Sequence, residues 1–275
     1  MSAFVRLQKV LPQHLISRAV GELAASESWV RGPLIRGFAR VYGIDMADAE
    51  RADLASYRSF NDFFTRSLMP DARPIDSAPG AIVSPADGVV SQAGRIEHGQ
   101  LLQAKGIRYS FSALADVCAS STFDGGAFAT IYLSPSDYHR VHLPLSGRLV
   151  RTVAIPGKLF SVNATTEAGI EGLFAVNERL VMEFETEHGQ MLVVMVGAMI
   201  VASIETVWDG PASPYRQKQV TEHDLAFEAG DEIGRFLLGS SVVLAFETDR
   251  AALELTAGNV LRMGQRIGTG SRQED

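Results

Sequence analysis

Three short motifs in the sequence carry side chains that could together activate a hydroxyl group. An aspartate lies in Ser84–Gly88, two histidines lie in Ser134–His142, and a serine follows a glycine in Leu238–Ser240. A histidine that is oriented by an aspartate and takes the proton of a serine makes that serine nucleophilic. The candidate catalytic residues are therefore Asp87, His139, His142 and Ser240.

Each motif also has an ordinary structural interpretation. Gly239 and Ser240 stand between apolar runs, where a glycine often permits a tight bend. Asp87 is typical of a turn in which the side chain bonds its own backbone. The two histidines could share a metal, but prolines flank them and no third ligand stands at a familiar spacing, so no metal site is expected. The functional interpretation therefore depends on the motifs occurring together.

The combination and order of these motifs resembles the phosphatidylserine decarboxylases of the bacterial type. The resemblance covers nearly the whole chain, from about residue 4 to about residue 268. One departure is that the family usually has threonine after the reactive serine, where this chain has Ser241, which keeps a hydroxyl. Gly239 before it favours Ser240 as the reactive residue. The matching strings are Pro85–Gly88, Gln103–Gly106, Tyr138–His142, Pro156–Gly157, Leu159–Asn163, Ser203–Trp208 and Leu238–Ser240.

The resemblance implies an enzyme that cuts itself and turns Ser240 into a pyruvoyl group, its covalent cofactor. By triad logic, His142 is held in its tautomer by Asp87 and takes the proton of Ser240, whose hydroxyl attacks the carbonyl of Gly239. Elimination and loss of ammonia then leave the pyruvoyl group. The products are a long chain, residues 1–239, and a short chain, residues 240–275.

Decarboxylation of an amino acid leaves a carbanion and needs an electron sink, which enzymes take from pyridoxal phosphate or from a built-in carbonyl. None of the four lysines lies in a recognisable phosphate-binding motif. The resemblance implies that the pyruvoyl ketone forms a Schiff base with the amine of phosphatidylserine, which loses CO2 and becomes phosphatidylethanolamine. His139 is the candidate proton donor, because an unperturbed histidine pKa near ~6.5 suits transfer near neutral pH.

Charge is distributed unevenly along the chain. Residues 1–43 contain six basic and two acidic residues, a balance of +4, so the remainder carries −11 of the total −7. A basic head on an acidic body argues against general nucleic-acid binding. It fits contact with anionic lipid, where each basic residue near the surface contributes about 1 kcal/mol.

Residues 4–42 have the spacing of amphipathic helices, and Pro12 suits the first turn of the second one. Packing of the apolar stripes on the protein's own core is the alternative to membrane contact. The resemblance favours contact with an anionic membrane surface, peripheral and on the cytoplasmic side of the cell membrane, where phosphatidylserine is reached. It leaves a monomer and a homodimer both open.

The fold class expected is α+β, with amphipathic helices followed by a mostly antiparallel β catalytic domain that has carrier-domain-like turns. Residues 1–80 form the helical region and connector, with a short helix capped by Ser59, and residues 81–275 form the β-rich domain. The uncharged part of Met191–Val207 is too short to span a membrane, which needs about 20 residues. The strongest predicted strands are Ala127–Leu133, Arg148–Ile155, Arg179–Glu185, Met191–Val207 (either one strand or two strands with a bend) and Val242–Glu247.

Two other functions use the same residues. A serine hydrolase would attack an external substrate and stay in one piece, but it usually carries its serine in a strand-to-helix elbow, and a strand is predicted after Ser240. A non-enzymatic β module docked on membranes would show neither cutting nor a reactive carbonyl.

Overall fold

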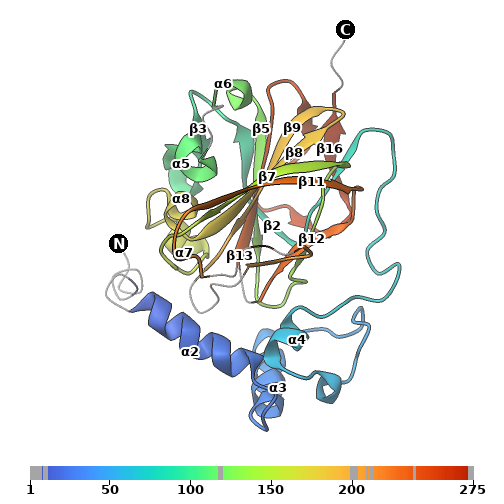
Figure 1. Ribbon diagram of the computed structural model, residues 1–275. Helices are drawn as coiled ribbons and strands as arrows, with labels where there is room; N and C mark the ends of the chain where they lie inside the picture. The colour runs from blue at the N-terminus through green and yellow to red at the C-terminus, as the bar shows by residue number, and fades with distance from the viewer. Residues whose placement is uncertain are drawn as a thin grey trace.

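The computed structural model describes residue 8 and residues 12–116, 120–198, 204–208, 210, 214–237 and 240–271. A helical head is joined by a long connector to a larger body of antiparallel sheet (Figure 1). The α+β class predicted from the sequence is therefore confirmed. The backbone alone is described for six residues, namely His14, Leu15, Ser120, Ser121, Ala164 and Ser240.

The helices of the head begin and end where local chemistry dictates. Helix α3 stops at Gly43, whose φ of 62° is left-handed and whose N–H bonds the carbonyl of Ala39. The hydroxyl of Ser59 accepts the N–H of Asp62, so the predicted cap of α4 is confirmed. The helix predicted before Pro12 lies outside the described residues, apart from residue 8. The described elements are α2 (Gln13–Ala25), α3 (Arg31–Tyr42), the 3-10 turn η1 (Leu54–Ser56) and α4 (Phe60–Phe64).

A small aromatic core holds the head together. Three of its ring pairs pack edge to face, at centroid distances of 4.9, 5.9 and 5.5 Å, which lie in the favourable range for aromatic pairs. The short helix α4 supplies three of the six buried members of this core, although five residues are too few for an isolated helix to be stable. Its buried members are Ala24, Ile35, Tyr57, Phe60, Phe63 and Phe64.

The body is built on an eight-stranded sheet in which neighbouring strands are antiparallel, in the order β11-β7-β8-β9-β13-β5-β2-β15. Strand β13 lies in its interior, paired with β5 on one side and β9 on the other. Its residues alternate between two cores, one on each face, as the two-residue period of a strand requires. The strands are β2 (Gly88–Arg95), β5 (Ala127–Leu133), β7 (Gly147–Ile155), β8 (Arg179–Thr186), β9 (Gly189–Val196), β11 (Gln219–Phe227), β13 (Ser240–Phe246) and β15 (Val260–Leu261).

Smaller sheets and single-turn helices complete the body. The predicted strand over 191–207 is two strands, β9 and β10, with residues 199–203 between them outside the described part. One small sheet has the order β10-β12-β6 and holds the second predicted histidine. The remaining elements are β1 (Ala81–Val83), β3 (Gln100–Leu102), η2 (Ala104–Gly106), β4 (Arg108–Ser110), α5 (Phe111–Ala115), α6 (Ser120–Phe123), β6 (Arg140–His142), α7 (Ala164–Glu167), α8 (Leu173–Val176), β10 (Ile204–Thr206), β12 (Glu232–Phe236), β14 (Ala251–Leu253) and β16 (Arg266–Gly270).

Candidate active site

The connection from β5 to β6 lies beside the end of β12 and the start of β13. The N–H of Phe236 donates to the carbonyl of His139 at 2.9 Å, and Ser240 pairs with Leu133. These two contacts lie at the two ends of the β5–β6 connection. Residue 240 therefore begins its strand beside the connection that carries the histidine string.

The predicted cleavage site falls partly outside the described residues. Leu238 and Gly239 lie outside them, and of Ser240 only the backbone is described, at the first position of β13. For the neighbouring Ser241, both the backbone and the side chain are described. Its hydroxyl is buried between β5 and β9 and has no hydrogen-bond partner in the described part of the chain.

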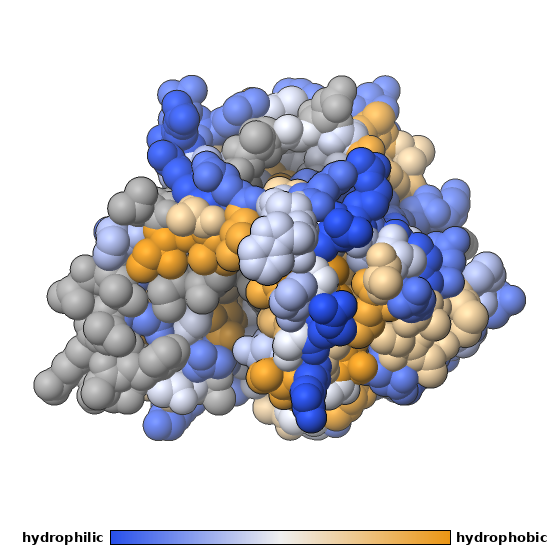
Figure 2. Space-filling view, turned by 90° about the horizontal axis from the view of Figure 1, so that it is seen from below, coloured by the Kyte–Doolittle hydropathy of each residue, from blue (hydrophilic) through white to orange (hydrophobic). Residues whose placement is uncertain are grey.

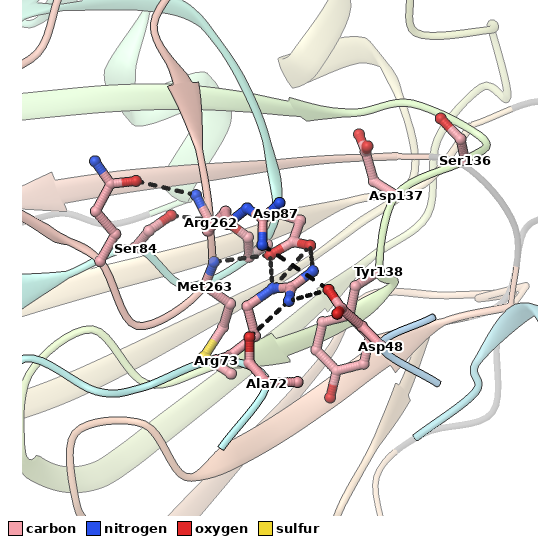
Figure 3. A network of polar contacts seen from close by, with 12 residues as sticks. Asp48, Ala72, Arg73, Ser84, Asp87, Ser136, Asp137, Tyr138, Arg262 and Met263 are labelled. Atoms are coloured by element: carbon pink, nitrogen blue, oxygen red, sulfur yellow. Dashed lines mark hydrogen bonds and ion pairs between the residues drawn. The ribbon is translucent and has the colours of Figure 1, made fainter. Parts of the chain in front are cut away.

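Asp87 lies two strands away from Ser240. It immediately precedes β2, and β5 lies between β2 and β13, so a spacing of about 4.8 Å per strand puts the two backbones ~10 Å apart. Its carboxylate is held by Arg73, whose Nε donates at 2.9 and 3.1 Å and whose Nη2 donates at 2.6 Å (Figure 3). The N–H of Met263 donates to the same carboxylate at 2.8 Å. The hydrogen bond to Asp87 is the main cause that raises the pKa of Arg73 above its ordinary value.

His142 is oriented by a different group from the one predicted. Its Nδ1 lies 2.7 Å from the carbonyl of Gly230 and its Nε2 lies 3.1 Å from the hydroxyl of Tyr138. Because a carbonyl only accepts, Nδ1 carries the proton and Nε2 accepts from the tyrosine. The predicted contact with Asp87 is therefore wrong, since that carboxylate is engaged by Arg73. Asp87 still acts through space: burial lowers the pKa of His142, and the charges of nearby acids including Asp87 oppose that shift.

His139 is fully buried against the ring of Phe64, at a centroid distance of 4.0 Å. Its Nδ1 donates to the carbonyl of Asp137 at 2.8 Å, and its Nε2 has no partner in the described part of the chain. Burial lowers the pKa of His139 to about 3. The unperturbed pKa expected from the sequence is therefore wrong. In this state His139 is neutral, with the lone pair of Nε2 unoccupied.

The residues that follow α4 hydrogen-bond to the segment that carries both histidines, a contact that the sequence did not predict. Arg66 is 4% exposed and its Nη2 donates to the carbonyl of Ser136 at 3.0 Å. Arg140 reaches back to the carbonyl of Thr65 at 2.9 Å and to the hydroxyl of Ser67 at 2.6 Å. The sequence signal for this contact was the aromatic content of α4, because three phenylalanines in five residues must be buried against another part of the protein. The head thus fixes the backbone on which both histidines stand.

Acid is expected to destabilise the fold through His139. Its pKa falls from 6.5 in the unfolded chain to about 3 in the folded one, so below pH 6.5 the unfolded state binds a proton that the native state does not. The free energy of unfolding should fall with pH between these values, by up to about 1.4 kcal/mol per pH unit from this group, and no slope arises above pH 6.5. Urea unfolding of Ser240→Ala, with and without His139→Gln, checks this between pH 7.5 and 5. Parallel pH dependences in the two chains would contradict the assignment.

The sequence matches known protein families and individual curated proteins over most of its length. A family model described as phosphatidylserine decarboxylase matches residues 60–269, and a second, described as PSD, matches residues 3–43. The chain is 48% identical over 269 residues to a phosphatidylserine decarboxylase proenzyme of Acinetobacter baylyi, covering 96% of this chain and 94% of that protein. It is 50% identical to proteins of the same name from Ectopseudomonas mendocina, with 96% and 97% covered, and Azotobacter vinelandii, with 98% of each covered.

Proposed function

The chain belongs to the phosphatidylserine decarboxylase family, and on that premise we propose that this carboxy-lyase converts phosphatidylserine to phosphatidylethanolamine and CO2 with a pyruvoyl group made from its own Ser240. The observation that carries the proposal is the start of β13 at Ser240, beside the connection that bears His139. The word proenzyme in the names of the relatives supports a processed chain.

In the proposed self-cleavage, the hydroxyl of Ser240 attacks the carbonyl carbon of Gly239. The peptide C–N bond breaks, its nitrogen takes a proton, and an ester now links the two residues. Loss of the α-proton of residue 240 with cleavage of its Cβ–Oγ bond leaves a carboxylate on Gly239 and a dehydroalanine at position 240. One water then enters and one ammonia leaves, which gives the ketone. The balance is one water consumed and one ammonia released per chain.

We assign the first proton transfer to Nε2 of His142. The hydrogen bond from Nδ1 to Gly230 leaves Nε2 unprotonated, so it can accept the serine proton once the hydroxyl of Tyr138 turns aside. The imidazolium that forms is buried and would be costly in isolation. The hydrogen bond to Gly230 and the charges of Glu232 and, to a smaller extent, Asp87 offset part of that cost. Gly230 therefore takes the orienting role expected of Asp87, and Asp87 contributes only one of the charges that favour the imidazolium.

The pyruvoyl carbonyl would supply the electron sink that decarboxylation needs. The chain's contribution at this stage is a buried imidazole that can return a proton to the substrate. Nε2 of His139 is buried without a hydrogen-bond partner in the described part of the chain, and the carbonyl of the same residue bonds the end of β12, so we assign to this nitrogen the proton that returns to the substrate carbon. Because the resting ring is neutral, it must first collect that proton, and it can do so only after substrate or solvent reaches it.

We further propose that the head places the enzyme on the anionic, cytoplasmic face of the cell membrane. Apolar side chains are exposed there, with Trp29 82% and Val41 77% accessible, and Arg18, Arg36 and Arg40 are exposed on the same helices or next to them. Figure 2 views this side of the molecule and shows apolar residues interspersed with hydrophilic ones. In the described part of the chain, no helix is both long and apolar enough to cross a bilayer. Contact of a basic, aromatic surface with anionic lipid is the arrangement that fits.

The intact mass of the purified protein tests the proposed function. We expect two fragments, residues 1–239 and a C-terminal fragment lighter by one ammonia than a peptide with a free N-terminal serine at 240. Treatment with borohydride should add hydrogen to the C-terminal fragment alone, because it carries the ketone. A single uncut chain that decarboxylates phosphatidylserine would rule out this chemistry. An uncut chain that hydrolyses esters instead would favour a serine hydrolase.

A further inference from the structure

Arg73 joins two acidic groups at the base of the candidate site. Its side chain is 9% exposed, and its fork donates three hydrogen bonds to the carboxylate of Asp87 (Figure 3). Its remaining terminal nitrogen, Nη1, donates to Asp48 at 2.8 Å and to the carbonyl of Ala72 at 2.7 Å. Asp48 belongs to the head and is 44% exposed. Four of the five N–H groups of the guanidinium are therefore engaged, two of them by the buried carboxylate of Asp87.

The connector, the turn before β2 and the distant segment after β15 converge on this pair. The N–H of Asp76 donates to the carbonyl of Gly264 at 3.0 Å, and Ser84 exchanges backbone bonds with Gly264 and Gln265 at 3.0 and 2.7 Å. The approach is so close that a Cβ on Gly264 would lie 2.6 Å from a backbone oxygen of the connector. If the chain is cut before Ser240, residues 262–265 belong to the short chain. The carboxylate of Asp87 then accepts hydrogen bonds from Arg73 of the long chain and from the N–H of Met263 of the short chain.

We propose that Arg73 is a positioning residue for self-cleavage, acting through Asp87, an inference that rests on the proposed function. A bidentate guanidinium fixes both the position and the plane of a carboxylate, which a single backbone N–H does not. A carboxylate with little exposure also needs a permanent cation beside it to remain charged. With Arg73 removed, Asp87 would keep, among the described residues, only the bond from Met263, and its charge would no longer be held at a fixed distance from His142.

The structure also offers a way to separate this role from simple structural support. Arg73 forms part of the wall of a cavity of about 590 Å³ between the connector and the segment after β15. A free guanidinium ion is small enough to enter such a space and occupy the position of the deleted side chain. Arg262 lines the same cavity, but its side chain is 70% exposed and its ion pair is a 3.9 Å contact with Asp48. It is the matched arginine that does not touch Asp87.

The experiment follows self-cleavage of newly synthesised chains in a cell-free translation, from the fraction of uncut chain against time. Arg73→Ala should cut about 10- to 100-fold more slowly than the unaltered chain, the range expected when a catalytic group is misplaced by about 1 Å. Adding millimolar guanidinium chloride should restore much of the rate, whereas urea or sodium chloride at equal concentration should not. Arg262→Ala should cut at the unaltered rate.

Two outcomes would overturn the inference: an unaltered rate for Arg73→Ala, or slow cutting that guanidinium does not restore. If Arg73→Ala fails to fold, Arg73→Lys keeps the charge without the fork and should still cut more slowly than Arg262→Lys. Equal rates for that pair would also overturn it. Absence of cutting in the unaltered chain would instead bring down the proposed function, so the two failures are distinguishable.

Discussion

Replacing Ser240 with alanine is expected to give a single uncut chain of 275 residues that has lost decarboxylase activity by more than about four orders of magnitude. The loss is this large because the substitution removes both the nucleophile for cutting and the atoms from which the ketone is made. Without a carbonyl sink, the carbanion left by CO2 has no route of delocalisation. Denaturing gel electrophoresis and release of labelled CO2 from phosphatidylserine vesicles measure the two effects on the same sample.

The adjacent Ser241 provides the matched control. Its hydroxyl is buried and lacks a hydrogen-bond partner in the part of the chain that the structure describes, so Ser241→Ala removes a group that contributes little to stability. This variant should cut and turn over normally, with a free energy of unfolding within about 1 kcal/mol of the unaltered chain. If Ser241→Ala stays uncut while Ser240→Ala is processed, the reactive serine has been assigned one residue too early.

The fold was predictable where the signal is local. The run Ala127–Leu133 becomes β5 with the same bounds, because its apolar and β-branched residues suit a strand buried on both faces. The cap at Ser59 was also predictable from local sequence, because a serine just before a helix accepts the backbone N–H three residues later, here that of Asp62. The family was predictable from the order of the motifs, and the comparisons confirm it.

The contacts inside the site were not predictable, because they depend on how distant segments meet. The carbonyl that orients His142 comes from Gly230, 88 residues away, and any residue type could supply it. The partner of Asp87 comes from Arg73 in a connector that reads as a plain loop. The burial of His139 depends on Phe64, from a short helix whose cap shows where it begins but not which segment its aromatic face covers. Analogy with a catalytic triad predicted the residue types, but it did not predict that Gly230 orients His142 or that Arg73 binds Asp87.

The two histidines are expected to separate cutting from turnover. His142→Gln should remain uncut, because the base that takes the serine proton is lost. His139→Gln should still cut, yet decarboxylate about 10²- to 10⁴-fold more slowly, the contribution expected from one positioned proton donor. The structural reason is that Nε2 of His142 is held as an acceptor by the bond from Nδ1 to Gly230, whereas Nε2 of His139 is buried and has no partner among the residues that the structure describes. Glutamine keeps the size of the side chain and some of its hydrogen bonding.

Measuring cut fraction and turnover for both variants decides the assignment, because the two readouts move independently. Tyr138→Phe is the control for the base: it removes the hydroxyl that occupies Nε2 of His142, so cutting should continue. If His139→Gln blocks cutting and His142→Gln does not, the roles are exchanged, and the unoccupied nitrogen of His139 is the base for self-cleavage. Either histidine is a neutral, buried imidazole and could accept the proton of Ser240. The position of the serine hydroxyl, not the pKa, therefore determines which histidine acts in self-cleavage.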